Sequence, residues 1–241
     1  MRRLLVTTLV LLVVVGGGLY AMDRVSANYA ESQVAKQVSN EVAARKLTSQ
    51  APAVEVGGFP FLTQVIGGRY EQITINLRDL SNGQLTLPLL TIVATDVDAP
   101  LDKVRAGEGP ITASKVTGES TVPWSAIVTA VGAKGLVLSG DDSGKVHVSG
   151  AVTLGGLSVP LTGGGTASVS NGRVRFAITE LTTTDANVTD TIQGLIDQYK
   201  SRLSYEFSVP KLPYDLKLTE VRATVGGVRI SGVAVNVPLV T

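Results

Sequence analysis

The residues that could carry out acid–base or metal chemistry are few in this chain. His147 is the only histidine and cysteine is absent, which excludes clusters of histidine or thiolate metal ligands and a cysteine nucleophile. Val146 and Val148 flank His147 in an alternating pattern, so we expect this histidine on the solvent-facing side of a strand. A single exposed histidine is more typical of a protein surface than of an active site.

Other motifs that occur in enzymes are incomplete. Asp96 and Asp98 would share one face of a strand, and an exposed strand end explains this pair more simply than a paired-carboxylate site. Gly163-Gly164-Gly165 lacks the lysine of a phosphate-binding loop and precedes a strand, so we expect a hairpin turn there. The Gly-x-Ser-x-Gly motif of many hydrolases does not occur. We therefore expect no enzyme activity, no catalytic residue, no metal and no cofactor.

Charge and composition narrow the remaining classes. The 241 residues include 21 Lys and Arg against 20 Asp and Glu, whereas a nucleic-acid binder needs a basic surplus to offset phosphate charge. Hydrophobic residues make up 44% and aromatic residues only 5%, so aliphatic side chains must supply most of the core. The 26 glycines suit the many turns of a β-rich fold.

The N-terminus predicts a membrane-targeting segment. Arg2 and Arg3 precede a run without charges from Leu4 to Met22, which as a helix would rise about 28 Å, close to the thickness of the bilayer's hydrocarbon core. The two arginines favour a cytoplasmic N-terminus, with residues 23–241 outside the cytoplasm. We expect a single-pass anchor in the cytoplasmic membrane through residues 4–22.

A cleaved signal peptide is the alternative for this segment. Val25-Ser26-Ala27 offers small residues for cleavage, and cleavage would give a secreted or periplasmic protein. In both cases residues 1–26 form a signal anchor or signal peptide, and residues 27–241 form a single β-rich domain.

Three segments beyond Met22 have helical periodicity. Small apolar residues recur on one face from Ala27 to Val42, in a helix that Ala51-Pro52 would end. Pro123 suits the start of a second helix that begins at Trp124. The third has the strongest apolar stripe, which consists of Val188, Ile192, Leu195, Ile196, Tyr199 and Leu203.

Most of the remaining chain alternates apolar and polar residues with the period of a strand. Such alternation indicates one apolar and one solvated face. The clearest runs are Tyr70–Leu77, Val146–Leu154, Leu157–Leu161, Val174–Ile178, Leu216–Leu218, Val221–Val225, Val228–Ile230 and Val233–Val237. Asn171-Gly172 between two of them predicts a hairpin. We expect an α+β, β-rich fold in which a long, curved antiparallel sheet wraps around the amphipathic helices.

The most distinctive stretch is GGFPFLTQVIGGRYEQITI, from Gly57 to Ile75. It gathers bulky side chains in a short segment with several bends, which fits either a plug that closes one end of the sheet or the rim of an apolar cavity. With the stripes of the later helices it defines our candidate cavity-lining, lipid-binding residues: Phe59, Phe61, Leu62, Val65, Ile66, Ile127, Val131, Ile192, Leu195, Ile196 and Tyr199.

The same stretch resembles the actinobacterial LmeA-like phospholipid-binding family. The F-P-F-L-T-Q core and the following G-R-Y carry the resemblance, together with Leu212-Pro213 and the Gly226-Gly227 turn before the last strand. It extends roughly from Ala27 to Val240. The resemblance implies a fold similar to the tubular lipid-binding proteins, in which a curved sheet and helices enclose an apolar groove. It also implies phospholipid binding outside the cytoplasmic membrane, as in the assembly of envelope lipids or lipoglycans.

Two functions remain open at this point. The first is a phospholipid-binding protein, which could act as a carrier; its partners would be phospholipid and the cytoplasmic membrane, with no nucleic acid. The second is a non-catalytic scaffolding domain of the cell envelope that docks a membrane enzyme. The sequence identifies no protein partner.

Overall fold

The computed structural model describes most of the chain. The described residues are 2–81, 83, 86–106, 111–130, 132, 135–154, 156–170, 173–183, 189–203, 205–208 and 217–240. Within these ranges, side chains are not described for residues 2–13, 130, 154, 157, 170, 173, 174, 190, 192, 199, 202, 203, 205–208 and 240.

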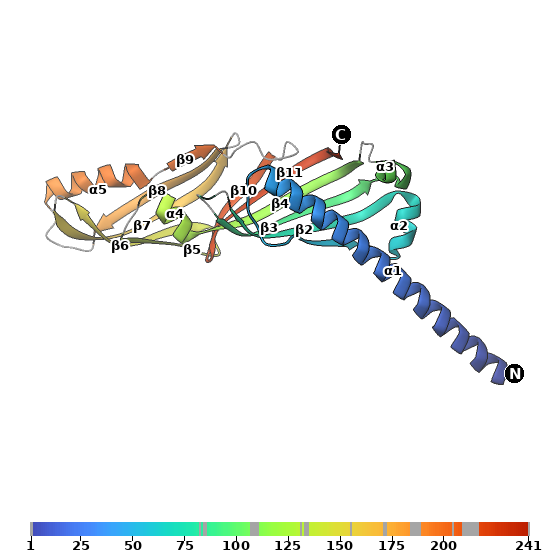
Figure 1. The fold of residues 1–241 in the computed structure, drawn as a ribbon. Helices are drawn as coiled ribbons and strands as arrows, with labels where there is room; N and C mark the ends of the chain where they lie inside the picture. Colours follow the sequence, from blue (N-terminus) through green and yellow to red (C-terminus); the bar gives the residue numbers. More distant parts are fainter. Residues whose placement is uncertain are drawn as a thin grey trace. The chain divides into compact units, whose positions relative to one another are not determined.

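The described chain contains a long N-terminal helix and four short ones (Figure 1). Their bounds are α1 Arg2–Ala44, α2 Phe61–Gly67, α3 Leu101–Ala106, α4 Trp124–Ala130 and α5 Asp190–Leu203. The helices predicted after Pro123 and around Leu195 are confirmed as α4 and α5.

The strands form two sheets. One has the order β1-β2-β3-β4-β11-β10 and the other the order β5-β6-β7-β8-β9. The bounds are β1 Ala53–Gly57, β2 Arg69–Ser81, β3 Thr86–Asp98, β4 Ile111–Pro123, β5 Leu136–Gly140, β6 Lys145–Leu154, β7 Leu157–Ser170, β8 Arg173–Thr183, β9 Tyr205–Ser208, β10 Lys217–Thr224 and β11 Gly227–Val240. The β-rich α+β class and the antiparallel pairing are thus confirmed, but with two sheets where the sequence suggested one.

Helix α1 joins the N-terminal segment to the next segment with helical periodicity. It runs without interruption from the uncharged N-terminal run into the segment with the small apolar stripe, whose Ala27 is buried. The prediction that it extends to Ala51-Pro52 was wrong, because the helix ends at Ala44 and Lys46 adopts a positive φ of 58°. Among the residues that the structure describes, no helix combines the length and the apolar character needed to cross a membrane.

The triple glycine is not a turn. Gly163-Gly164-Gly165 lies inside β7, which continues from Leu157 to Ser170. The pairing of β7 with β8 shifts between Gly164 and Gly165, so that Thr179 of β8 is left over as a bulge. The bulge changes the alternation of β8, and Ile178 and Leu181 therefore both face the core. The prediction of a hairpin at this position was wrong because glycines also permit close strand contact.

The predicted turn at Gly226-Gly227 is confirmed, because β10 and β11 pair across Thr224 and Gly227. Strands β5 and β6 are joined through Asp142-Ser143-Gly144. Strands β7 and β8 pair up to Ser170 and Arg173, although the predicted turn residues Asn171-Gly172 lie outside the described part of the chain, as do Leu212-Pro213.

The chain divides into two compact units. Unit 1 comprises Met1–Leu77, Ile92–Val116 and Val235–Thr241, and unit 2 comprises Arg78–Thr91 and Thr117–Ala234. Each has its own apolar clusters. In unit 1, α1 packs on β1 and α2; in unit 2, α5 packs on β8 and β6, and α4 packs on β5. The prediction of a single domain from residue 27 to 241 stays a prediction.

Candidate functional site

One apolar assembly of unit 2 lies between α5 and the five-stranded sheet (Figure 1). Residues of one face of the sheet contribute to it because successive side chains of a strand point to opposite faces. Its buried members are Leu136, Val148, Val152, Val159, Leu161, Ile178, Leu181 and Ile196. Val128 of α4, Leu138 of β5 and Leu195 of α5 pack against this cluster and remain partly accessible. The assembly thus has a closed apolar centre with an apolar margin that solvent or a ligand can reach.

The predicted cavity residues of the later helices do not all belong to this assembly. Ile196 is fully buried in it and Leu195 lies at its margin. Ile127 belongs to a neighbouring cluster of unit 2 around Trp124. Val131 lies outside the described residues, and the side chains of Ile192 and Tyr199 are not described.

The predicted cavity residues of the Gly57–Ile75 stretch lie in unit 1. Phe61 is buried against Ala27 and Val56, and Leu62 and Val65 pack against the same cluster. Phe59 and Ile66, by contrast, are 61% and 84% exposed. The stretch therefore has a buried half, which fits the interpretation as a core plug, and an exposed apolar half that the sequence did not predict.

Asp23 of α1 connects the long helix to this stretch. Its side chain is only 3% exposed, and its Oδ1 accepts a 2.8 Å hydrogen bond from the N–H of Leu62. Burial raises the pKa of Asp23, but hydrogen bonds from the N–H groups of Leu62 and Phe61, together with the Arg24 guanidinium at 3.3 Å, outweigh burial and lower this pKa below its usual value. The carboxylate thus satisfies N–H groups in the first turn of α2 that have no partner within the helix.

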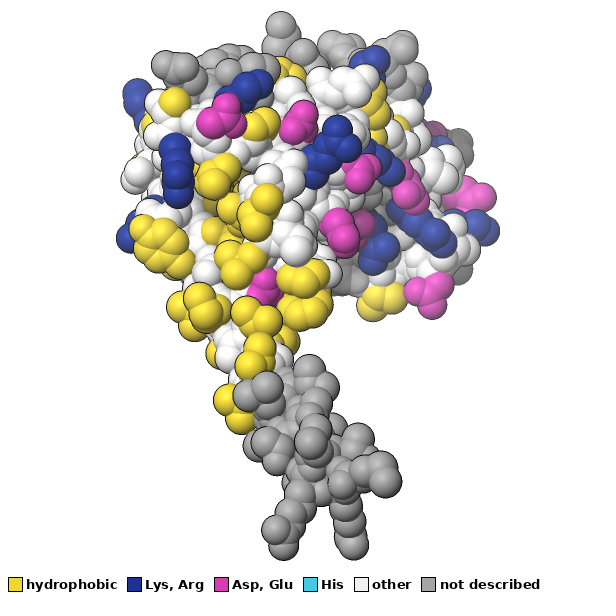
Figure 2. Space-filling view, turned by 90° about the vertical axis from the view of Figure 1, so that its right-hand side faces the viewer, with side chains coloured by type: hydrophobic (Ala, Val, Ile, Leu, Met, Phe, Trp, Pro, Cys, Tyr) yellow, Lys and Arg dark blue, Asp and Glu magenta, His cyan; other side chains and the backbone are white. Residues whose placement is uncertain are grey.

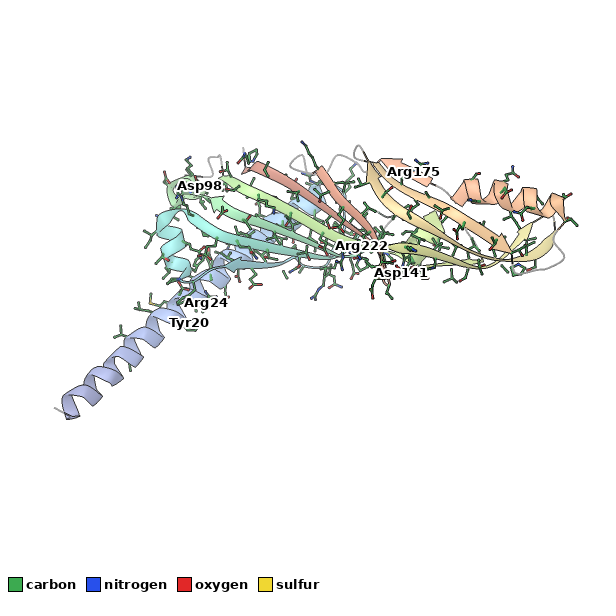
Figure 3. All side chains as sticks on the ribbon, turned by 180° about the vertical axis from the view of Figure 1, so that it is seen from behind. Tyr20, Arg24, Asp98, Asp141, Arg175 and Arg222 are labelled. Carbon is green, nitrogen blue, oxygen red and sulfur yellow. The ribbon has the colours of Figure 1, made fainter. Side chains whose placement is uncertain are left out.

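Aromatic and cationic side chains surround the exposed Phe59. The ring centroid of Tyr20 lies 5.9 Å from that of Phe59, and Cζ of Arg24 lies 5.7 Å from the same centroid. Tyr20 and Arg24 are one turn apart on α1 (Figure 3). These contacts fix Phe59 against the helix while most of its ring stays exposed.

Asp141, Ser143 and His147 form a polar group in unit 2 whose residue types also occur in catalytic sites. Asp141 Oδ2 lies 2.8 Å from His147 Nε2, and Ser143 Oγ donates a 2.6 Å hydrogen bond to Asp141 Oδ1. Nucleophilic catalysis requires the hydroxyl to contact the base, whereas here serine and histidine both bind the same carboxylate. The hydrogen bonds from Ser143 and His147 hold the pKa of Asp141 well below its usual value. The group therefore stabilises the turn between β5 and β6, and His147 is exposed as predicted.

Two open pockets lie in unit 2, and no predicted cavity residue whose side chain the structure describes is among their lining residues. One, of about 450 Å³, includes Asp141, Asp142, Arg222 and Arg229; Arg222 donates a hydrogen bond to the carbonyl of Asp142, and Asp141 and Arg222 are labelled in Figure 3. The other, of about 280 Å³, is lined by Pro88, Leu89, Thr91, Glu119, Ser120, Thr121, Pro123 and Gly226. The lining of the first pocket is mainly polar and suits a polar group better than an acyl chain, whereas apolar atoms predominate in the lining of the second.

Sequence reasoning missed Asp23, Arg24 and Tyr20. Asp23 and Leu62 are 39 positions apart, and no local pattern connects them. The one available signal was that Asp23 is the first acidic residue after the uncharged run, at a point where the helical pattern continues.

Comparison with known proteins agrees with these apolar features. The family model described as LmeA-like phospholipid-binding matches residues 21–233. The chain belongs to this family. No curated protein and no solved structure matches the chain, so the likeness to tubular lipid-binding proteins stays a prediction.

Proposed function

We propose that this member of the LmeA-like family binds phospholipid outside the cytoplasmic membrane, with acyl chains against the apolar interior of unit 2, and acts as a carrier in envelope lipid or lipoglycan assembly. The observation that carries the proposal is the match to a phospholipid-binding family over residues 21–233. Lipid binding at the level of the family is thereby shown; the location of the acyl chains, the carrier role and the compartment are our inference.

The margin of the unit 2 assembly supports this location. Val128, Leu138 and Leu195 come from three different elements and pack against one buried cluster. An acyl chain that inserted among them would gain roughly 0.8 kcal/mol for each CH₂ group removed from water. Affinity of this kind requires no catalytic group, and we accordingly propose that the protein is not an enzyme and needs no cofactor.

The structure of α1 supports a retained anchor over a cleaved signal peptide. Cleavage at Val25-Ser26-Ala27 would divide a continuous helix and remove Asp23, which binds the first turn of α2. The family match also begins before that point, at residue 21. We therefore propose that residues 4–22 remain in the cytoplasmic membrane and that residues 23–241 lie outside the cytoplasm.

A test of lipid binding is native mass spectrometry of the gently purified full chain, followed by extraction and identification of the lipid. We expect a discrete phospholipid that persists after the annular lipids have been removed by detergent exchange. A folded protein that never carries lipid would reject the proposal and favour the scaffolding function.

The proposed topology has a separate test. A C-terminal alkaline phosphatase fusion should be active, because the enzyme folds only outside the cytoplasm. An inactive phosphatase fusion together with a fluorescent cytoplasmic reporter fusion would reject this arrangement.

A further inference from the structure

Large apolar side chains are exposed where α1 meets α2. We call this group the junction surface and define it as Tyr20, Met22, Val25, Tyr29, Phe59 and Ile66, which are 56–84% exposed. Figure 2 shows hydrophobic side chains gathered around the point where α1 leaves the rest of unit 1. Val14, Val15 and Leu19, further back on α1, are also exposed. Contiguous apolar surface of this kind marks an interaction site.

The arrangement of α1 explains why this surface continues beyond the uncharged run. Asp23 and Ala27 are four residues apart and face the interior of unit 1, where both are buried. Met22, Val25 and Tyr29 recur at intervals of three and four on the exposed side of the helix. Asp23, the first acidic residue after the run, is thus turned away from the exposed side. Apolar exposure therefore extends past Met22 to Tyr29, a rise of about 10 Å.

Helix α2 adds a second element to the same surface. Its sequence FLTQVIG carries no charge. Phe61 anchors it in the core, while Ile66 is 84% exposed. The contacts of Phe59 with Tyr20 and Arg24 hold the start of this segment against α1. Because Asp23 binds the N–H of Leu62, α2 is fixed to α1 at the level where the uncharged run ends.

We propose that the junction surface docks unit 1 on the outer leaflet of the bilayer that holds the anchor. This inference rests on the proposed anchor, and the occupant is the lipid surface itself. The surface is continuous along α1 with the uncharged residues 4–22, so a bilayer around the anchor reaches it first. Tyrosine side chains favour the membrane–water interface, and Tyr20 and Tyr29 are both exposed on this surface. An apolar face inserts about 5–10 Å in such an arrangement, similar to the reach of the surface along α1.

Docking has a functional consequence for a lipid carrier. A protein held by a single helix could tilt freely, whereas contact through α1 and α2 together restricts unit 1 to one orientation on the leaflet. The junction surface is separate from the acyl-chain site proposed in unit 2, since all of its residues belong to unit 1.

The absence of cysteine allows a direct test with one introduced label. The full chain with Ile66→Cys carries an environment-sensitive nitrobenzoxadiazole dye and is reconstituted in vesicles of equal parts phosphatidylcholine and phosphatidylglycerol. The matched control is Val235→Cys, which is also in unit 1, 66% exposed and apolar, but lies within β11. We expect a blue-shifted emission at position 66 that spin-labelled lipids quench several-fold, and a water-like, unquenched emission at position 235.

The outcomes separate the possible failures. Equal, water-like emission at both positions would overturn the docking inference. A blue shift at position 66 without quenching by lipid would also overturn it, in favour of a protein or a second copy covering the surface. Flotation of the labelled chain with the vesicles identifies which proposal has failed. A chain that floats but shows water-like emission at position 66 refutes docking alone. A chain that does not float refutes the anchor and the docking together.

A charge substitution tests the contribution of the side chain itself. Ile66→Glu should reduce lipid quenching of a dye at Thr63→Cys several-fold, while Val235→Glu should leave it unchanged. Both native side chains are exposed, so neither change is expected to affect folding. Unchanged quenching in the Ile66→Glu variant would overturn the inference.

Discussion

The two units differ in where their exposed apolar side chains lie. In unit 1, most of the exposed large hydrophobic residues lie along α1 and beside or within α2, and only Val104 and Val235 of the described residues lie elsewhere. In unit 2, the exposed large hydrophobic residues of the described chain are Leu89, Val137 and Val225, which are spread over separate elements. Unit 2 instead buries its apolar residues between α5 and a sheet. Two regions of one lipid-binding chain thus offer two kinds of apolar site, an outer surface and an inner assembly.

Their carboxylates show the same division. Asp23 of unit 1 is buried and binds the backbone of α2, whereas Asp141 of unit 2 is partly exposed and binds a surface turn. Hydrogen bonds lower the pKa of both carboxyl groups: the side chains of Ser143 and His147 act mainly on Asp141, and the backbone N–H groups of α2 act on Asp23 against the effect of its burial. The burial of Asp23 keeps its charge away from the exposed apolar surface of α1. Asp141 instead orders a polar turn at the surface of unit 2. Variants of each region can therefore test whether the division is real.

The largest effect on unit 2 should come from Ile196→Ala. Ile196 is fully buried in the assembly beneath α5, and removing such a side chain leaves a cavity that typically costs about 2–5 kcal/mol. Urea unfolding followed by circular dichroism measures the change. Gln193→Ala, at an exposed position of the same helix, should change stability by less than about 0.5 kcal/mol. Equal effects of the two substitutions would show that α5 does not cover the core.

A slightly smaller loss of stability is expected from a substitution in the triple glycine of β7. A Cβ atom at Gly163 would lie 2.1 Å from the carbonyl oxygen of Glu180, whereas one at Gly164 would have no atom nearer than Val146 O at 3.7 Å. Gly163→Ala should therefore force β7 and β8 apart and cost about 1–3 kcal/mol, as overpacking does. Gly164→Ala is the matched control and should fold with nearly unchanged stability. A stable Gly163→Ala protein would mean that β7 does not run through this site.

In unit 1, Asp23→Ala should lower the melting temperature by a few degrees. The substitution leaves the N–H groups of Leu62 and Phe61 without the carboxylate that now accepts from them. Ser32→Ala, at an exposed site on the same helix, serves as the control in a thermal scan. Because the folded protein lowers the pKa of Asp23, its stabilising effect should be complete above the usual value of 3.8 and decrease as the pH falls below it. An Asp23→Ala protein with wild-type melting at neutral pH would contradict the role assigned to this carboxylate.

The smallest effect is expected at the exposed turn of unit 2. Asp141→Asn removes a charge that accepts hydrogen bonds from Ser143, Lys145 and His147. The variant should be slightly less stable than the wild type at neutral pH, and the difference should shrink as the pH falls below 3.8, because the folded state lowers the pKa of Asp141. Asp142→Asn controls for the change in net charge. A difference that grows towards acid pH would contradict the stated direction of the shift.

His147→Ala should be almost neutral in the same assay. The side chain is about half exposed, and exposed ion pairs contribute little to stability. A loss of more than about 2 kcal/mol would lie outside the range usual for a surface position and would show that the histidine does more than complete the turn.

The sequence predicted those elements whose pattern is local. Periodicity located α4 and α5, and alternation located β2, β6, β7, β8, β10 and β11. The FPFLTQ motif and the following GRY led to the family by resemblance, which the match over residues 21–233 confirms. Of the candidate site residues, Phe61, Ile127 and Ile196 are buried, and their contact with lipid stays a prediction.

What the sequence could not predict depends on distant contacts. Strands β1, β3, β4, β5 and β9 carry weaker alternation and were not identified. The uncharged, short α2 resembles a bend-rich loop in sequence, and it is fixed by Asp23, 39 positions before Leu62. The division of the bulky residues between two units follows from strand pairing over long distances in the sequence. Phe61 and Leu195 lie in different units, and a local sequence pattern does not indicate this division.

The most direct test of the account compares two variants in one assay, the amount of phospholipid that co-purifies per mole of folded protein. Leu195→Trp should occupy space at the margin of the unit 2 assembly and lower bound phospholipid, while Gln193→Trp on the exposed side of α5 should not. Ile66→Glu should leave bound phospholipid unchanged, because the junction surface contacts the bilayer and not the carried lipid. If Leu195→Trp carried as much phospholipid as the wild type while Ile66→Glu carried less, the roles assigned to the two units would be contradicted.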